Sequence, residues 1–287
     1  MIRKYTRLMP LVFTVILLLT ITNILIIYKN LPVIAILVEV FTVFFILFAV
    51  YLVRRDLQQR TELEHHKDEF ISIASHELKT PITSLKVFNK LLQKKLENAP
   101  LAELHRYISK IDEQTSRLTS LVTSLLDLSR VQTGKMKLEK APFDLNDLLR
   151  DTVEAVQETT HKHIIIVKGR IKKIVNADRY RMYQVLVNLL TNAIKYSPDG
   201  KKIIVTIKEN GEHVQVQVKD AGIGIDKKNQ KKIFERLFQV PSPNKKMLPG
   251  LGMGLYITEE IIRKHGGKIW VESTKGRGST FYFTLPN

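Results

Sequence analysis

The chain has 287 residues and a formal net charge of +17, and it contains no cysteine. That length fits about two domains and is too great for a single helical bundle. The lack of cysteine excludes disulfide bonds, zinc–cysteine sites, iron–sulfur clusters and thiol catalysis. A strongly basic composition is typical of nucleic-acid-binding proteins, but the charge here is unevenly distributed along the sequence.

The first part of the chain holds two long apolar runs. Residues 8–28 contain no charged side chain, and residues 30–53 contain a single one, Glu39. Each run exceeds the roughly 18 apolar residues that mark a membrane-spanning helix. A cleaved signal peptide is the alternative for the first run, but that run is longer than the usual apolar stretch of about 7 to 15 residues. The sequence therefore predicts membrane helices at about residues 8–28 and 33–53.

The two runs form a predicted hairpin over residues 1–53, because only a turn-forming segment, residues 29–32, separates them. Basic residues flank the hairpin at both ends: Arg3, Lys4 and Arg7 before it, and Arg54, Arg55 and Arg60 after it. Positive charge favours the cytoplasmic side of a membrane. We therefore expect a multi-pass protein of the inner (cytoplasmic) membrane with both termini in the cytoplasm.

Glu39 is the one acidic residue within these runs, about a third of the way into the second. An ionisable group inside a membrane is a candidate functional group. The alternative is that Glu39 lies near enough to the outer interface to reach water or Lys29. Because the hairpin has almost no external part, we expect the stimulus to arrive within the bilayer or from a partner membrane protein such as a transporter, with Glu39 as the candidate sensing residue.

Residues 54–134 carry a helical pattern. Residues 54–69 contain no Gly or Pro, so the second membrane helix can continue into the cytoplasm. Apolar stripes with helical spacing follow at Leu78, Ile82, Leu85, Leu92 and Leu96, and at Leu104, Ile108, Ile111, Leu118, Val122 and Leu125. Two antiparallel helices cannot bury such stripes alone, so we expect an all-α hairpin that forms a four-helix bundle in a homodimer.

His76 lies on the first of these helices. Thr80 follows it by four positions, which places both residues on one face, while Leu78 and Ile82 belong to the apolar stripe. His76 should therefore point into solvent. A neutral imidazole is a good nucleophile near pH 7, and the neighbouring Glu77 can accept the proton of its other ring nitrogen.

Residues 135–287 alternate between strand and helix patterns and predict an α/β sandwich. Strands are expected at 164–167, 203–207, 214–218, 269–271 and 280–285, and helices at about 144–160, 179–196 and 253–265. On the second of these helices, Asn188, Asn192 and Lys195 share one face. Two amide oxygens and a cation can hold magnesium and the phosphates that it bridges; a polar, solvent-facing stripe is the alternative.

Two glycine-rich segments follow that helix. In the first, Asp220 precedes Gly222 and Gly224, so a carboxylate that can accept a hydrogen bond from an exocyclic amine lies beside backbone open to close approach; an ordinary turn is the alternative. In the second, Gly250, Gly252 and Gly254 open a helix and can expose backbone N–H groups to phosphate. The Pro- and Lys-containing loop before them is long enough for a mobile lid.

The string His76-Glu-Leu-Lys-Thr-Pro81 closely resembles the phosphoacceptor box of the sensor histidine kinases of two-component systems. The later motifs resemble, in order and spacing, those of the histidine-kinase ATP-binding domain, a Bergerat-type fold shared with gyrase and heat-shock chaperones. The resemblance covers about residues 64–287. It implies that His76 is phosphorylated, that Glu77 accepts the proton, and that Thr80 helps water attack when the enzyme runs as a phosphatase.

The resemblance also implies roles in nucleotide binding. Asp220 would contact the adenine amine, with Gly222 and Gly224 beside it, and Asn188 and Asn192 would lie at Mg²⁺. The other nucleotide-binding positions implied are Lys195, Tyr196, Arg236, Gly250, Gly252, Gly254 and Thr280. ATP-hydrolysing relatives carry Glu where this chain has Asn188; because an amide cannot accept a proton, the site suits transfer of the γ-phosphate to His76.

The sequence thus predicts a membrane-bound sensor histidine kinase that uses Mg-ATP, forms a homodimer and passes the phosphoryl group to an Asp of a cytoplasmic response regulator. Two features depart from the family pattern: Gln239 replaces an Arg, and only residues 54–75 separate the hairpin from the phosphoacceptor box. One alternative is a phosphatase-dominant or kinase-dead relative. Another is a membrane-tethered basic module for nucleic acid or lipid, suggested by the lysines at 227, 228, 231 and 232; we expect no nucleic-acid partner.

Overall fold

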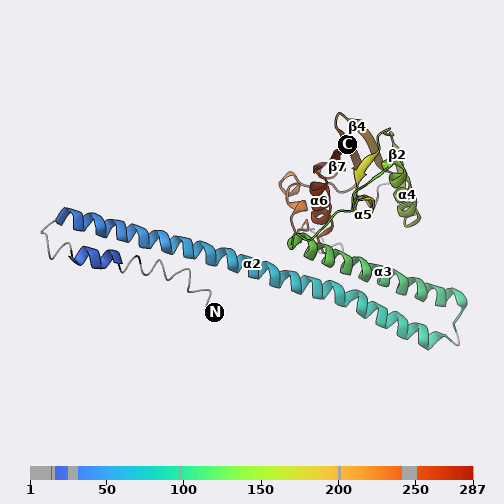
Figure 1. Cartoon of the computed structure of the whole chain (residues 1–287). Helices are drawn as coiled ribbons and strands as arrows, with labels where there is room; N and C mark the ends of the chain where they lie inside the picture. Colours follow the sequence, from blue (N-terminus) through green and yellow to red (C-terminus); the bar gives the residue numbers. More distant parts are fainter. Residues whose placement is uncertain are drawn as a thin grey trace. The chain divides into compact units, whose positions relative to one another are not determined.

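The computed structural model describes residues 14, 17–24, 32–96, 99–199, 202–240 and 251–286. The chain divides into two compact units, Met1–Ser72 and Ile73–Asn287. In the first unit, residues 17–24 are helical, and helix α2, Pro32–Lys95, begins (Figure 1). Helix α2 continues beyond Val53 without interruption, as the absence of Gly and Pro predicted, and passes through Pro81.

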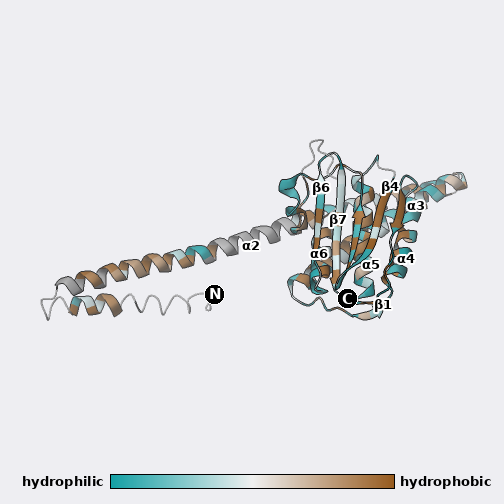
Figure 2. Ribbon diagram, turned by 90° about the horizontal axis from the view of Figure 1, so that it is seen from above, coloured by the Kyte–Doolittle hydropathy of each residue, from teal (hydrophilic) through white to brown (hydrophobic). Residues whose placement is uncertain are grey.

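The N-terminal part of α2 exposes apolar side chains. Phe41, Phe44 and Leu47 are 62%, 65% and 63% exposed, and Figure 2 shows apolar residues along this part of the helix. Among the described residues, no helix combines the length and the apolarity that crossing a membrane requires. The membrane hairpin stays a prediction, and much of its first helix, together with the side chain of Glu39, lies outside the described residues.

The second unit begins with a helix pair, formed by the C-terminal part of α2 and by α3, Leu101–Gln132. An ion pair between Lys95 and Glu103, 2.7 Å long, joins the helices near the connecting turn. The apolar stripes are only partly covered within one chain, since Ile82 and Ile108 are each 51% exposed. Two helices alone therefore leave apolar surface uncovered, as the pattern predicted.

The rest of the second unit is a layer of helices on a mixed five-stranded sheet, with strand order β2-β4-β5-β7-β6. Strands β2 and β4 pair in parallel, and the other neighbours are antiparallel. The helices cover one face of the sheet (Figures 1 and 2). The elements are β1 (Ala141–Phe143), α4 (Leu145–Glu158), β2 (Ile164–Lys168), β3 (Val175–Ala177), α5 (Arg179–Tyr196), β4 (Lys202–Asn210), β5 (His213–Lys219), the short 3₁₀ turns η2 (Lys227–Asn229) and η3 (Lys232–Phe234), α6 (Gly254–Lys264), β6 (Ile269–Thr274) and β7 (Gly278–Pro286).

The core lies between this sheet and its helices. Alternate residues of the central strands, such as Val216 on β5 and Phe283 on β7, are fully buried, because successive side chains of a strand point to opposite faces. They share the core with Leu186 and Leu190 of α5 and Ile261 of α6, all with 0% exposure. This packing gives α5, which carries the asparagines, a fixed position on the sheet.

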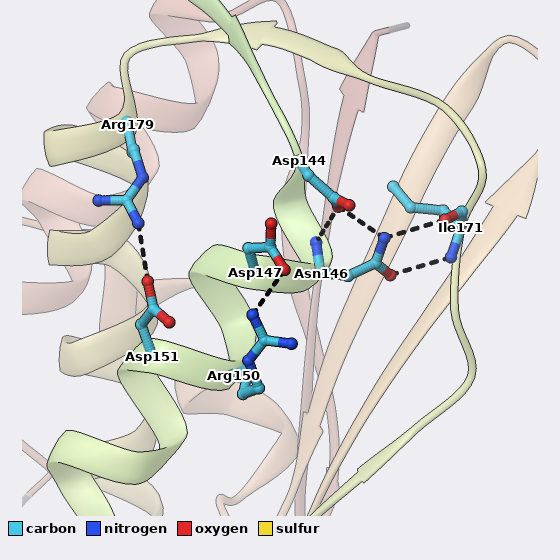
Figure 3. A network of polar contacts seen from close by, with 7 residues as sticks. All are labelled: Asp144, Asn146, Asp147, Arg150, Asp151, Ile171 and Arg179. Atoms are coloured by element: carbon cyan, nitrogen blue, oxygen red, sulfur yellow. Dashed lines mark hydrogen bonds and ion pairs between the residues drawn. The ribbon is translucent and has the colours of Figure 1, made fainter.

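A polar network fixes the start of α4 (Figure 3). The carboxylate of Asp144 accepts a hydrogen bond from the backbone N–H of Asn146 at 2.7 Å and so caps the helix. The Asn146 amide bonds both the carbonyl and the N–H of Ile171. On the exposed side of the helices, Arg179 of α5 pairs with Asp151 of α4 at 2.8 Å. These contacts join α4 to α5 and to the segment before β3.

Candidate functional site

His76 projects from α2 into solvent, with its side chain 81% exposed. Its Nδ1 lies 3.9 Å from Oε1 of Glu77, whose side chain is only 18% exposed. The other Glu77 oxygen, Oε2, lies 3.2 Å from a guanidinium nitrogen of Arg117 on α3. Arg117 was not predicted, because the ion pair joins residues that are 40 positions apart in the sequence.

This geometry assigns different roles to the two imidazole nitrogens. Nδ1 faces the carboxylate of Glu77, which leaves Nε2 as the nitrogen with a free lone pair. The 3.9 Å separation is too long for a hydrogen bond, so a side-chain rotation has to close it; catalytic hydrogen bonds are often long in ligand-free enzymes. Thr80 lies one turn further on, and its hydroxyl donates to the carbonyl of His76 at 3.2 Å.

Two adjoining cavities lie over α5 and the segments that face it. The inner cavity, about 100 Å³, is lined by Asn192, Tyr196, Asp220, Ile223, Gly224, Ile225, Ile233, Phe238, Gln239, Val240, Leu255, Ser279 and Phe281. The outer cavity, about 300 Å³, is lined by Ser120, Leu121, Ser124, Asn188, Thr191, Asn192, Lys195, Tyr196, Ile233, Phe238, Gln239, Leu251, Gly252, Met253, Gly254 and Leu255. The walls of the inner cavity are mostly apolar, whereas many residues of the outer cavity are polar. An apolar pocket with a few convergent polar groups is typical of small-molecule sites.

Asp220 is the acidic group of the inner cavity and is only 5% exposed. Its Oδ1 accepts hydrogen bonds from the backbone N–H groups of Gly222 at 2.8 Å and Ser279 at 3.2 Å. Burial raises the pKa of this carboxyl group, and the two backbone hydrogen bonds partly oppose that effect. Neither bond uses Oδ2, so this oxygen can accept a hydrogen bond from an amine of a bound ligand.

Two glycines set the backbone near the cavities: Gly222 lies beside Asp220, and Gly252 lines the outer cavity. A Cβ at Gly222 would overlap the backbone carbonyl of Tyr196, so only glycine lets the Asp220 loop approach the end of α5. Gly252 has φ of +65°, a conformation that disfavours a side chain, and a Cβ there would lie within 3.0 Å of the backbone of Leu237 and Phe238. Both glycines therefore bring separate backbone segments together around the cavities.

The α5 residues match the donor set of a magnesium–phosphate site. Asn188 and Asn192 lie on one face of the helix, and the Nδ2 of Asn192 is 3.4 Å from the Oδ1 of Asn188. The Nζ of Lys195 lies 4.9 Å from the ring centre of Tyr196. Amide oxygens suit magnesium, which keeps several of its waters and takes few protein ligands. These residues therefore fit a magnesium ion bridged to phosphate.

The outer cavity has one wall from the helix pair itself. Ser120, Leu121 and Ser124 of α3 line it opposite the start of α6. Arg117, which holds Glu77, precedes Ser120 by three residues on the same helix. Helix α3 therefore contacts both the outer cavity and Glu77, which lies beside the histidine. No sequence pattern indicated this connection.

Some predicted site residues are not brought to the cavities. Gly250 and the predicted lid, residues 241–249, lie outside the described residues. Arg236 is half-buried but does not line either cavity. Thr280 also stays away, because β7 alternates: its neighbours Ser279 and Phe281 line the inner cavity instead. The backbone N–H of Ser279, next to Thr280, donates to Asp220.

Two protein-family models match the chain. Residues 66–134 match the His kinase A (phospho-acceptor) domain. Residues 177–287 match the histidine kinase-, DNA gyrase B- and HSP90-like ATPase. The first range contains His76, Glu77 and Arg117, and the second contains Asp220 and the asparagines of α5, so the two parts of the site fall in the two matched domains.

Named relatives agree with these models. The chain is 31% identical to the sensor histidine kinase WalK of Bacillus subtilis over 236 residues, 80% of this chain and 38% of that protein. It is 36% identical to the alginate biosynthesis sensor protein KinB of Pseudomonas aeruginosa over 247 residues, 82% of this chain and 39% of that protein.

A solved structure also aligns with the chain: the histidine kinase ThkA in complex with the response regulator protein TrrA, with a TM-score of 0.54 and 29% identity over 76% of this chain and 61% of that one. The chain covers only 38% and 39% of the length of WalK and KinB. The matched domains nevertheless include both parts of the site. The chain belongs to the histidine kinases of two-component systems, with the phosphoacceptor domain and the ATPase domain of that family.

Proposed function

We propose that this protein is an ATP-dependent histidine kinase that phosphorylates His76 and transfers the phosphoryl group to an aspartate of a response regulator. One observation carries the proposal. Ser120 and Ser124 of helix α3 line the outer cavity. Arg117, three residues before Ser120 on the same helix, forms an ion pair with Glu77, the acid next to His76. Helix α3 therefore contacts both the proposed nucleotide cavity and the acid beside the solvent-exposed histidine.

The chemistry assigned to His76 follows from its surroundings. The lone pair of Nε2 attacks the γ-phosphorus of ATP, an N–P bond forms, and the bond between that phosphorus and the bridging oxygen of ADP breaks. The proton on Nδ1 passes to Glu77, which Arg117 keeps on the same side of the imidazole. Phosphoryl transfer depends mainly on positioning and charge neutralisation, and these residues provide the positioning.

The cavity residues would hold Mg-ATP in separate parts. Asp220 would accept a hydrogen bond from the adenine amine, while Asn188 and Asn192 would present oxygens to magnesium. When bound, magnesium neutralises the charge of the phosphates. Asn188 lacks the carboxylate that could activate water, which favours delivery of the phosphoryl group to histidine over hydrolysis.

The partners proposed are a second copy of the chain and a response regulator. The exposed apolar stripe, including Ile82 and Ile108, supports a homodimer that closes a four-helix bundle. The likeness to ThkA, whose solved structure contains the response regulator protein TrrA, supports the second partner.

Labelled ATP tests the kinase proposal. Purified full-length protein, given ATP labelled in the γ-phosphate and Mg²⁺, is expected to acquire an alkali-stable, acid-labile label that His76→Gln abolishes. His105→Gln is the matched control, because His105 is an exposed histidine on the other helix of the pair, and it should keep the label. A wild-type protein that takes up no label contradicts the proposal and favours a kinase-dead relative.

A second activity, dephosphorylation of the regulator, is supported by Thr80. Its hydroxyl lies one helical turn from His76 on the same face and donates to the His76 carbonyl at 3.2 Å, so a rotation can turn it toward a water near the histidine. Thr80→Ala is expected to slow regulator dephosphorylation at least tenfold and to leave autophosphorylation within about twofold. If dephosphorylation and autophosphorylation fall equally, Thr80 instead stabilises the helix and has no specific role in the phosphatase reaction.

We further propose that residues 1–53 anchor the protein in the cytoplasmic membrane as a hairpin. The support is the two long apolar runs, their basic flanks and the exposed apolar side chains of α2. The chain has no cysteine, so a single introduced cysteine is a unique probe. A membrane-impermeant maleimide should label Asn30→Cys in intact cells, and Ser109→Cys only after permeabilisation. Labelling of Ser109→Cys in intact cells would contradict this topology.

A further inference from the structure

The amide of Asn188 is held by a residue of the neighbouring helix. Helices α5 and α6 pack side by side on the sheet (Figure 1). The Nδ2 of Asn188 donates to the hydroxyl oxygen of Thr258 on α6 at 2.9 Å. Thr258 is 2% exposed, and Asn188 is half-buried at the edge of the outer cavity, so this hydrogen bond is partly buried. The Oδ1 of Asn188 faces the other way, toward Asn192.

The orientation of this amide matters for a metal ion. An asparagine can rotate its amide by half a turn with little change of shape, which exchanges an acceptor oxygen for an NH₂ donor. Only the oxygen can bind magnesium, whereas the NH₂ group would face the ion with its hydrogens. In the observed orientation the Thr258 hydroxyl oxygen accepts from Nδ2 and the Asn192 NH₂ group donates to Oδ1. The reverse orientation would bring two amide NH₂ groups, those of Asn188 and Asn192, together.

Helix α6 also provides the space for the oxygen. Gly254 precedes Thr258 by one turn, and a Cβ at Gly254 would overlap Oδ1 of Asn188. The oxygen therefore lies against bare backbone at the start of α6, at the edge of the outer cavity. Gly254 gives room to Oδ1, and Thr258 binds Nδ2.

We propose that Thr258 is a positioning residue for magnesium: its hydroxyl holds Nδ2 of Asn188 and thereby turns Oδ1 toward the nucleotide cavity. The inference rests on the proposed function, because it assigns magnesium to that cavity. It adds a residue that no motif of the sequence indicated. Partners behind metal ligands commonly change metal affinity by 10- to 100-fold when they are replaced.

Substitutions separate positioning from packing. Thr258→Val keeps the shape and the methyl group but removes the oxygen, so the amide of Asn188 loses its partner. Thr258→Ser keeps the oxygen and removes the methyl group. If Thr258 positions Asn188, the serine variant should show the Mg²⁺ dependence of the wild type. If Thr258 only packs in the core, the valine variant should show it. If the valine variant does not fold, Thr258→Ala also removes the oxygen without adding bulk.

The test measures the binding of a fluorescent ATP analogue to the full-length protein while Mg²⁺ is titrated, and again in EDTA. Thr258→Val should raise the Mg²⁺ concentration at half-maximal binding about tenfold, with the EDTA affinity within twofold of wild type. Thr258→Ser should match wild type. An unchanged Mg²⁺ midpoint in Thr258→Val, or a serine variant as impaired as the valine variant, overturns the inference alone. A wild type that binds no analogue overturns the proposed function together with it.

Discussion

Asp220, the proposed partner of the adenine amine, is buried at a cost in stability. It is buried, both of its hydrogen bonds go to Oδ1, and burial raises its pKa. Above the ordinary pKa of an aspartate, ionisation of this group costs more in the folded state than in the unfolded chain, so the charged carboxylate lowers stability at neutral pH. A group kept at such a cost is typical of a functional site.

Asp220→Asn is therefore expected to weaken ATP binding without lowering the free energy of unfolding. The asparagine oxygen can still accept the hydrogen bonds of Gly222 and Ser279, but its NH₂ group cannot accept one from an adenine amine. Losing a hydrogen bond to a charged group costs about 1.5–3 kcal/mol. We therefore expect the Kd for ATP, measured by calorimetry, to rise at least about tenfold. Asp226→Asn, in the same segment, is the control. Unchanged affinity in Asp220→Asn would remove the residue from the site.

Among the elements, α3 and α5 are joined by a buried ion pair. Arg181 donates to Asp127 at 2.8 Å, with side-chain exposures of 9% and 3%. Gln184 donates to the other oxygen of Asp127 at 2.7 Å. Asp127 is on the phosphoacceptor helix pair and Arg181 is on the helix that carries the asparagines, so this contact holds the ATPase domain against α3.

Arg181→Met is expected to lower the free energy of unfolding by about 3–5 kcal/mol, because it leaves the Asp127 carboxylate buried without its partner. Arg179→Met breaks a pair of similar length, Arg179 with Asp151, but that pair is more than half exposed and should cost less than about 1 kcal/mol. Urea unfolding can be followed by the fluorescence of Trp270, the single tryptophan. Equal effects of the two variants would contradict a structural role for the buried pair.

His265 joins the end of α6 to the start of α5. It is 3% exposed; its Nε2 accepts from the backbone N–H of Asp178 at 3.0 Å, and its Nδ1 lies 2.8 Å from the carbonyl of Ile261. Only the neutral ring with its proton on Nδ1 fits both partners. Burial mainly, with a contribution from Lys140, lowers the pKa of His265, while the Ile261 hydrogen bond and Asp178 oppose the shift.

The ATPase domain should therefore lose stability on acidification. The folded-state pKa of His265 lies below the ordinary value of 6.5, so the unfolded chain takes up the proton first as pH falls, and stability is lost from about pH 6.5 downward. His265→Gln keeps an acceptor for the Asp178 N–H and does not titrate, so its unfolding free energy should fall less steeply. His161→Gln, on the surface, is the control. Parallel pH profiles for all three proteins would contradict this.

In the whole molecule, local patterns predicted the longer helices and strands but not the contacts between them. The helix predicted at 179–196 is found at Arg179–Tyr196, because its periodicity is long and regular. Strands β1 and β3 have three residues each, too short for any period to show. The Glu77–Arg117 and Asn188–Thr258 pairs were missed because nothing local fixes which residues of separate helices meet.

Thr280 shows what a motif can and cannot locate. The final glycine turn predicted Thr280 at the nucleotide site; in the structure its neighbours Ser279 and Phe281 line the inner cavity, and the backbone N–H of Ser279 donates to Asp220. Successive side chains of a strand point to opposite faces of the sheet. The motif therefore located the segment, and the role of Thr280 stays a prediction.

The exposed apolar stripe of the helix pair is the proposed dimer interface. Ile108→Asp is expected to weaken the homodimer by on the order of a hundredfold, about 3 kcal/mol, because dimerisation would bury an unpaired charge. Since Ile108 is 51% exposed in the single chain, the variant should still fold. Ser109→Asp, the exposed neighbour, should leave the dimer intact. Analytical ultracentrifugation of the purified proteins measures the dimer affinity. If the Ile108→Asp variant is as dimeric as the wild type, Ile108 does not lie in the dimer interface.

The central claim is that ATP phosphorylates one nitrogen of one histidine. The most direct measurement is to identify the phosphorylated atom after incubation of the full-length protein with Mg-ATP, by peptide mapping and phosphorus NMR. Because Nδ1 of His76 faces Glu77, we expect phosphate on Nε2 of His76. Phosphate on another residue, on Nδ1 of His76, or on no residue at all would contradict it.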